Sequence, residues 1–286
     1  MTERDCWTEW LLRARFPEDP ELRERATKLL GAARTRVLDQ ADLTEGETLL
    51  DVGCGDGLIA FGAIERGAGP VVFSDISQDL LDESRRLAED LHVVDRCRFL
   101  RASADDLHEL DDESVDVVTT RSVLIYVDDK ESAFREFHRV LRPGGRVSLF
   151  EPINRLNRFV DAYDVSAVQE LDDRVKAVFR ELQPRDSDPM LNFDDRDLVE
   201  LAERAGFARV RLTLEVETAP PEPTPWDFFV DMPLNPRVPS PRAAMEQVLT
   251  PDERARYEAH LRPLVEGGIG SRRMASAYLV AVKSAG

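Results

Sequence analysis

A short run of glycines and acidic residues, Asp51-Val52-Gly53-Cys54-Gly55-Asp56-Gly57, is the segment of this chain best suited to bind a ligand. It follows an apolar, strand-like stretch over Thr48–Val52 and precedes a stretch of helical composition over Leu58–Arg66. Glycines at a strand-to-helix turn adopt backbone angles closed to most residues, and they let a ligand approach the main chain closely. The segment therefore predicts a site for a nucleoside-like cofactor.

The spacing of these glycines narrows the choice of cofactor. The dinucleotide fingerprint G-x-G-x-x-G, counted from Gly53 and Gly55, needs its third glycine where this chain has Leu58. No G-K-[ST] follows, so the segment is not a P-loop for a nucleoside triphosphate. A tight turn that binds no ligand stays open as the alternative while this segment is considered alone.

Several segments in a fixed order together resemble the class I S-adenosylmethionine-dependent methyltransferases. The resemblance is close from about Thr48 to Pro152 and looser over the rest of the core. It implies an enzyme that uses S-adenosylmethionine as methyl donor and releases S-adenosylhomocysteine. Besides the glycine run, the segments that carry it are Val72-Phe73-Ser74-Asp75-Ile76-Ser77, Ser103-Ala104-Asp105-Asp106-Leu107, Ser114–Val127 and Leu141-Arg142-Pro143-Gly144-Gly145-Arg146.

The resemblance implies which residues hold the sugar and amino-acid parts of the cofactor. In the family, the acidic glycine loop holds the methionine part, which here assigns Asp51, Gly53, Gly55 and Gly57. An acidic residue that closes the second strand holds the ribose hydroxyls, and Asp75 matches it. A carboxylate suits two adjacent hydroxyls because it can accept a hydrogen bond from each of them.

The adenine side of the predicted site departs from the family pattern. Ile76 matches the apolar neighbour that packs on adenine, but Ser103 stands where relatives often have an aspartate. We therefore expect the adenine contact to come from Ser103 or from the backbone around Ala104 and Asp105. In the family, the loop after the fourth strand borders cofactor and acceptor, which assigns Arg121 to the cofactor site as well.

Two residues beyond the cofactor loop are candidates for catalysis. The methyl group of this cofactor is already electrophilic, so positioning and exclusion of water do most of the work, and a base is needed only if the acceptor must lose a proton. Tyr126 lies in the loop after the fourth strand, and Glu151 follows the fifth strand, where it could orient or deprotonate an acceptor. A purely structural role in the loop is the alternative for each of them.

The elements that must position these residues alternate between strands and helices. This alternation predicts an α/β fold with a parallel sheet and helices on both faces. With the family resemblance, the expectation is a Rossmann-like, seven-stranded, mostly parallel sheet. The strands are expected at Thr48–Val52, Val71–Ser74, Cys97–Arg101, Val115–Thr119, Gly145–Phe150, Ala208–Glu217 and Ala275–Val282.

Segments outside this alternation are expected to cover the site. Residues 1–45 read as an N-terminal helical cap, and residues 46–286 as the methyltransferase core with insertions at about 152–193 and 218–270. We expect the cap and the insertions to form a lid over a small acceptor. Aromatic residues in these segments could line an acceptor pocket, although ordinary core packing explains most of them: Trp7, Trp10, Tyr163, Trp226, Phe228 and Phe229.

Composition excludes several classes of partner. A formal net charge of -18 opposes binding to nucleic acid, which needs a basic surface. Three cysteines without a C-x-x-C pair and four scattered histidines predict neither a disulfide frame nor a metal site. The absence of a long apolar run or a secretory signal favours a cytoplasmic protein without a membrane anchor. Oligomeric state is left open, with a homodimer as one option.

The sequence thus predicts a methyltransferase that moves a methyl group from S-adenosylmethionine to a small molecule by in-line displacement. A regulator that binds S-adenosylmethionine without catalysis is an alternative, because binding and turnover use different residues. A nicotinamide-dependent oxidoreductase is a weaker alternative, since Leu58 breaks the dinucleotide fingerprint.

Overall fold

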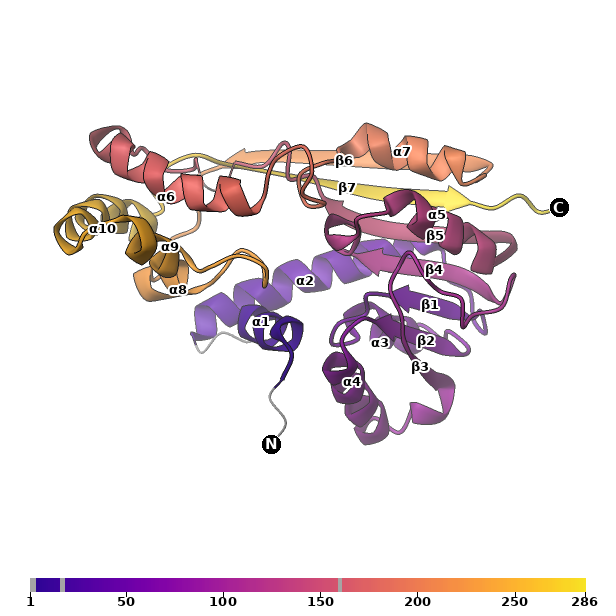
Figure 1. The fold of residues 1–286 in the computed structure, drawn as a ribbon. Helices are drawn as coiled ribbons and strands as arrows, with labels where there is room; N and C mark the ends of the chain where they lie inside the picture. Colours follow the sequence, from indigo (N-terminus) through magenta and orange to yellow (C-terminus); the bar gives the residue numbers. More distant parts are fainter. Residues whose placement is uncertain (1–3, 16–18, 159–160) are drawn as a thin grey trace. The chain divides into compact units, whose positions relative to one another are not determined.

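A computed structural model describes residues 4–15, 19–158 and 161–286, and its centre is one mixed β-sheet (Figure 1). The sheet has seven strands in the order β3-β2-β1-β4-β5-β7-β6. The strands are β1 Leu49–Val52, β2 Val71–Asp75, β3 Cys97–Arg101, β4 Val115–Arg121, β5 Leu141–Pro152, β6 Arg209–Ala219 and β7 Arg272–Val282. The predicted Rossmann-like, seven-stranded architecture is confirmed.

The first five strands run parallel to one another, and β7 is antiparallel to β5. Strand β1 lies between β2 and β4, and Asp51 pairs in register with Phe73 on one side and Thr119 on the other. Because parallel neighbours end at the same edge, the segments that follow β1, β2 and β4 lie near one another. The order of strands thereby gathers the predicted site residues along one edge.

Helices cover both faces of this sheet. Successive residues of a strand point to opposite faces, and both Leu49 and its neighbour Leu50 are fully buried in β1. Leu49 joins one core cluster with Val37 of α2 and Ile59 of α3, so these two helices pack on its face. Leu50 must be covered from the other face, which is the pattern of a doubly wound sheet.

The helices begin and end close to where local sequence signals place them. They are α1 Cys6–Arg15, α2 Pro20–Ala41, α3 Leu58–Glu65, α4 Gln78–Asp90, α5 Lys130–Val140, α6 Gln169–Leu182, α7 Asp195–Arg204, α8 Trp226–Asp231, α9 Pro241–Val248 and α10 Pro251–Glu266, with short 3-10 turns at Val94–Arg96, Leu124–Tyr126 and Ser166–Val168. No helix of the described residues has the length and apolar character that a membrane crossing requires.

One expected helix is broken in two. The residues near Arg242–Leu261 have the composition of one continuous helical stretch, which predicts a single helix, but α9 ends at Val248 and α10 begins at Pro251. Thr250 caps the new helix by accepting a hydrogen bond from the Glu253 N–H, and the Glu253 side chain accepts one from the Thr250 N–H. This capping box, with proline at the first helical position, starts a helix rather than continuing one.

The chain divides into two compact units, which we describe separately. The first comprises residues 1–152, 193–214 and 276–286, and the second comprises residues 153–192 and 215–275. In the second unit, α6, α8, α9 and α10 enclose an apolar cluster around Trp226 and Val230. Beside it, the Tyr257 hydroxyl donates to Asp172 at 2.8 Å, and Lys176 pairs with the same carboxylate at 2.7 Å.

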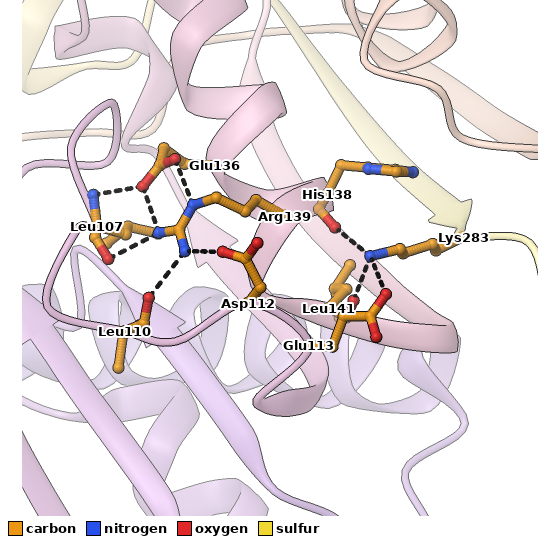
Figure 2. A network of polar contacts seen from close by, with 9 residues as sticks. All are labelled: Leu107, Leu110, Asp112, Glu113, Glu136, His138, Arg139, Leu141 and Lys283. Carbon is orange, nitrogen blue, oxygen red and sulfur yellow. Dashed lines mark hydrogen bonds and ion pairs between the residues drawn. The ribbon is translucent and has the colours of Figure 1, made fainter.

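Two basic side chains, Arg139 and Lys283, connect α5 with the segment after β3 and with the start of β5 (Figure 2). Arg139 of α5 donates to the Leu107 and Leu110 carbonyls and pairs with Glu136 and Asp112. These acidic partners raise the pKa of the Arg139 guanidinium, so it stays charged. Lys283, just after β7, donates to the carbonyls at the end of α5 and the start of β5. The two networks fix α5 against the sheet.

Candidate functional site

The glycine loop after β1 uses the backbone freedom that its sequence predicts. Gly53, Gly55 and Gly57 have φ angles of 63°, 56° and 81°, in the left-handed region. The Cys54 N–H donates to the Ser74 carbonyl at 2.9 Å, which joins the loop to the end of β2. The loop therefore turns sharply and stays attached to the neighbouring strand.

Neighbouring side chains leave no room for anything larger than glycine in this loop. A Cβ atom placed on Gly53 would overlap the side chain of Val123, which follows β4. One placed on Gly57 would lie 2.5 Å from the Phe61 ring, and one on Gly55 would lie 3.0 Å from Leu11 of α1. Side chains from α1, from α3 and from the segment after β4 therefore lie close to the glycine positions of the loop.

Asp75 ends β2 with a buried carboxylate directed at the glycine loop. Its Oδ2 accepts a hydrogen bond from the Gly55 N–H at 2.9 Å, and its Oδ1 accepts one from the Ser77 N–H at 2.9 Å. Burial, aided by the nearby charge of Asp5, raises the pKa of Asp75. A carboxylate can accept about four hydrogen bonds, so Asp75 retains acceptor capacity for a ligand hydroxyl, and its contact with ribose stays a prediction.

The segments predicted for the adenine side lie next to Asp75. The Ala102 N–H, just after β3, donates to the Asp75 carbonyl at 3.1 Å. Ile76 is 45% exposed, which leaves an apolar surface beside the carboxylate. In the following turn, the Ser103 hydroxyl donates to the Asp105 carboxylate, and Ala104 is buried. The contacts that these residues make with adenine stay a prediction.

Asp51 is buried at the end of β1 and both of its oxygens already have partners. Oδ1 accepts a hydrogen bond from the Thr119 hydroxyl at 2.8 Å, and Oδ2 accepts one from the Ala60 N–H at 3.2 Å. Burial raises the pKa of Asp51 to about 7, and the positive charge of Arg121 at the end of β4 acts in the opposite direction. These contacts position the loop, and direct binding of cofactor by Asp51 or Arg121 stays a prediction.

Glu151 is completely buried at the end of β5 and holds the turn that follows β4. Its Oε1 accepts hydrogen bonds from the N–H groups of Val123 at 2.9 Å and Leu124 at 3.0 Å. Its Oε2 accepts one from the Ile125 N–H at 3.3 Å. Burial raises the pKa of Glu151 to about 7. This geometry favours a positioning role, and a catalytic role for Glu151 stays a prediction.

Tyr126 closes the turn that Glu151 holds, and its ring meets the N-terminal helix. The rings of Tyr126 and Trp7 contact edge to face, with centroids 4.8 Å apart and planes at 78°. Tyr126 is half-buried, in keeping with a side chain that packs at one end and is accessible at the other. Its catalytic role also stays a prediction.

Sequence reasoning missed the way in which α1 is fixed beside Asp75. The Asp5 carboxylate accepts hydrogen bonds from the Thr8 N–H at 2.8 Å and the Ser77 hydroxyl at 2.6 Å. The Asp5 N–H in turn donates to Asp79 at 2.8 Å. Asp5 therefore caps α1 while holding the cap residue of α4, Ser77. An aspartate three residues before Thr8 is a helix-start signal, but its long-range partner has no local signature.

Other residues that the sequence suggested for the site are buried or packed in the hydrophobic core. Trp226 is buried in the core of the second unit, with Tyr163 and Phe229 packed against the same cluster. Cys54 is buried, and burial raises the pKa of its thiol well above the usual value, which opposes nucleophilic use. Among the residues with described positions, no three or more histidine, cysteine, aspartate or glutamate side chains gather as metal ligands.

Comparisons with known proteins assign this chain to a class. Residues 50–149 match the family model of the methyltransferase domain. The chain is 30% identical over 179 residues to a ubiquinone/menaquinone biosynthesis C-methyltransferase, UbiE, of Idiomarina loihiensis, covering 60% of this chain and 71% of that protein. The chain belongs to the class I S-adenosylmethionine-dependent methyltransferases, and S-adenosylmethionine is its cofactor. The alternative of a nicotinamide-dependent oxidoreductase is thereby excluded.

Other relatives extend over different shares of the chain. It is 37% identical over 121 residues to an uncharacterized 37.1 kDa protein in transposon TN4556 of Streptomyces fradiae. This alignment covers 41% of the present chain and only 33% of the length of that relative. Among solved structures, the YcgJ protein from Bacillus subtilis aligns with 89% of this chain and 99% of its own, with a TM-score of 0.56 and 17% identity. Phosphoethanolamine N-methyltransferase 2 of Haemonchus contortus, solved with S-adenosylhomocysteine, aligns with 97% of this chain and 60% of its own, with a TM-score of 0.53 and 17% identity.

Removal of the Asp75 carboxylate tests its predicted contact with ribose. We expect Asp75→Ala to weaken S-adenosylhomocysteine binding by roughly 1–3 kcal/mol, the scale of a lost charge-assisted hydrogen bond. Calorimetric titration measures the effect, with Asp90→Ala as control, because Asp90 is exposed at the C-terminal end of α4. An unchanged dissociation constant in Asp75→Ala would remove this residue from the ribose site.

Proposed function

We propose that this methyltransferase transfers the methyl group to a small-molecule acceptor by in-line displacement. The proposal rests on the contacts among three segments at one edge of the sheet. The glycine loop donates a hydrogen bond to Asp75, and Val123 of the turn after β4 packs against Gly53. Ligands of open α/β sheets bind at the carboxyl ends of the strands, which is where these segments lie. When bound, S-adenosylmethionine supplies a methyl carbon on a positively charged sulfur.

The residues of the chain divide into two sets under this proposal. Tyr126 faces the acceptor, while Glu151 either acts on the acceptor or holds the turn that carries Tyr126. The bare glycine backbone receives the amino-acid part of the cofactor, and Asp75 receives the ribose. The full set assigned to the cofactor is Asp51, Gly53, Gly55, Gly57, Asp75, Ile76, Ser103, Ala104, Asp105 and Arg121.

A small acceptor agrees best with the charge of the chain. The net charge of -18 repels polyanions such as nucleic acids. The relative from Idiomarina is named for C-methylation in quinone biosynthesis, which supports a small organic acceptor without identifying it. Within the first unit, the N-terminal helices are proposed to restrict access to such a molecule, because protein and nucleic-acid acceptors need an open surface.

A methyl-transfer assay tests the proposal directly. The protein is incubated with S-adenosylmethionine carrying a labelled methyl group and with separate pools of small metabolites, protein and RNA. We expect label in a small-molecule fraction and equal release of S-adenosylhomocysteine. Label confined to protein or RNA would overturn the proposed acceptor class, and binding without turnover against every pool would favour a non-catalytic role.

The conservative change Tyr126→Phe tests whether Tyr126 is catalytic. It removes the hydroxyl and retains the ring that contacts Trp7. If the hydroxyl acts on the acceptor, we expect kcat to fall by roughly 10²-fold or more, the scale of a lost acid–base group, with the affinity for S-adenosylhomocysteine unchanged. Trp7→Phe is the matched control for packing. A Tyr126→Phe enzyme with the wild-type kcat would assign Tyr126 to packing alone.

A further inference from the structure

The strand β6 lies at the end of the strand order and presents one side of its backbone outward. Nearly all residues from Arg209 to Thr218 are exposed or only partly buried. Leu214 and Val216 are 36% and 51% exposed, although both are apolar. An edge strand of this kind offers unpaired N–H and C=O groups to another chain.

The sequence of β6 is complementary to itself in the antiparallel direction. It reads Arg209-Val210-Arg211-Leu212-Thr213-Leu214-Glu215-Val216-Glu217. When two copies are related by a two-fold axis at Thr213, Arg209 lies opposite Glu217 and Arg211 opposite Glu215. On the other face, valine lies opposite valine and leucine opposite leucine. Opposite charges and matched apolar side chains are the cross-strand pairs that stabilise a sheet.

We propose that two copies of this chain form a symmetric homodimer by antiparallel pairing of β6 with β6 around Thr213. The pairing continues the sheet from one protomer into its partner and covers Leu214 and Val216. It does not depend on the methyl-transfer proposal, because β4, β5 and β7 lie between β1 and β6 in the sheet.

The charge pattern selects this register over its neighbours. A shift of two residues in either direction keeps only half of the opposite-charge pairs and places the remaining charges against threonine or outside the run. A shift of one residue puts three of the four charged residues opposite valine or leucine, because side-chain direction alternates along a strand. Parallel pairing in register would set Arg209 against Arg209 and Glu217 against Glu217.

Protection against aggregation does not explain this pattern. Charges on an edge strand protect against pairing only where they do not meet opposite charges on another copy. Here the two arginines precede the two glutamates, so the run from Arg209 to Glu217 has no net charge, in a chain whose net charge is -18. The run is therefore a place where a second copy of an acidic protein can approach with little repulsion.

Paired charge reversals test the dimer. Sedimentation velocity over a range of concentrations is expected to show the wild-type protein at twice the chain mass of 32.3 kDa. R209E/R211E and E215R/E217R each place like charges opposite one another at all four positions. Each should therefore raise the dimer dissociation constant by roughly tenfold or more, because all four opposite-charge pairs become like-charge pairs. The variants are compared at a concentration just above the wild-type dissociation constant, where the wild type is a dimer and each double variant should be a monomer.

Two combinations then separate specific pairing from general damage. Mixing the two variants places Glu opposite Arg throughout, so a heterodimer should form from two monomeric proteins. The quadruple variant R209E/R211E/E215R/E217R restores self-complementarity and should dimerise again. Lys28→Glu with Arg196→Glu changes net charge as much as R209E/R211E, at exposed positions outside β6, and should leave the dimer intact. Circular dichroism and S-adenosylhomocysteine binding verify that each variant is folded.

The outcomes decide the proposal in either direction. A wild-type monomer at every concentration would overturn it. So would a dimer that survives R209E/R211E, which would place the interface elsewhere, and so would failure of the mixed variants to associate. Dimerisation of the wild type, the mixture and the quadruple variant, with monomers for each double variant alone, would support it.

Discussion

Gly53→Ala is expected to abolish most of the cofactor affinity of this enzyme. The φ angle of Gly53 is 63°, and its added Cβ atom would overlap the side chain of Val123. A non-glycine residue held in this region costs of order 1–3 kcal/mol, and displacement of Val123 adds to that cost. We expect the affinity for S-adenosylhomocysteine to fall by roughly 10- to 100-fold, which calorimetric titration measures.

Gly31→Ala is the matched control for this experiment. Gly31 lies inside α2, and an added Cβ atom would meet nothing within 4 Å. Alanine there should stabilise the helix by roughly 0.5–1 kcal/mol and leave cofactor affinity unchanged. The double variant Gly53→Ala/Val123→Ala removes the overlap but keeps the strained backbone, so it should recover only part of the loss. Wild-type affinity in Gly53→Ala would show that the cofactor does not need this loop.

The second large effect is expected at Glu151. Glu151→Ala leaves three buried N–H groups, those of Val123, Leu124 and Ile125, without their acceptor. Each unsatisfied buried donor costs roughly 1–3 kcal/mol. We expect a loss of several kcal/mol in the free energy of unfolding, measured by urea denaturation, together with weaker cofactor binding as Val123 loses its position against Gly53. Glu109→Gln, at an exposed position, is the control and should change neither quantity.

The neutral variant Glu151→Gln isolates the effect of pH. Because burial raises the pKa of Glu151 to about 7 from an ordinary value of 4.5, the folded protein keeps this proton where the unfolded chain has lost it. The resulting stability is fully present below about pH 4.5, declines as pH rises, and is lost above about pH 7. Glutamine cannot titrate, so the stability gap between wild type and variant should narrow from pH 5 to pH 8. A gap that widens over this range would contradict the account, since it would mean that the ionised carboxylate is favoured by the fold.

The same variants separate positioning from catalysis at Glu151. If Glu151 only holds the 123–125 turn, its substitution should lower cofactor affinity and the free energy of unfolding together. The rate of methyl transfer should then recover at saturating S-adenosylmethionine. A general base should lower kcat even at saturation, with a pH profile that loses its acidic limb. The three hydrogen bonds that Glu151 accepts favour the first result.

The sequence predicted the sheet because its strands are marked locally. The strands are apolar runs such as β1 or alternating runs such as β6, bounded by turn residues or by a helix, and these signals do not depend on distant contacts. Strand order is not marked locally and was not predicted, while the number of strands and their mostly parallel direction were expected from the family resemblance. The break at Thr250 was also marked locally, since Thr250 is followed by Pro251 and then Glu253, but helical periodicity on both sides concealed it.

The site was predictable only in part, for the same reason. The glycines come directly after β1, and Asp75 and Ile76 stand at the end of β2. Their grouping therefore follows from the parallel pairing of these two strands. The contact of Glu151 with Val123 joins residues 28 positions apart, and that of Ser77 with Asp5 joins residues 72 apart. Such contacts depend on how α1 and the turn after β4 pack, which no local pattern encodes. The sequence therefore indicated Glu151 as a site residue without showing that its oxygens are already engaged.

Parallel titrations of this protein with S-adenosylhomocysteine and with NAD⁺ decide which cofactor the glycine loop binds. We expect one binding site per chain for S-adenosylhomocysteine, with affinity weakened roughly 10- to 100-fold in Gly53→Ala and unchanged in Gly31→Ala, and no heat from NAD⁺. Binding of NAD⁺ with no response to S-adenosylhomocysteine would contradict it.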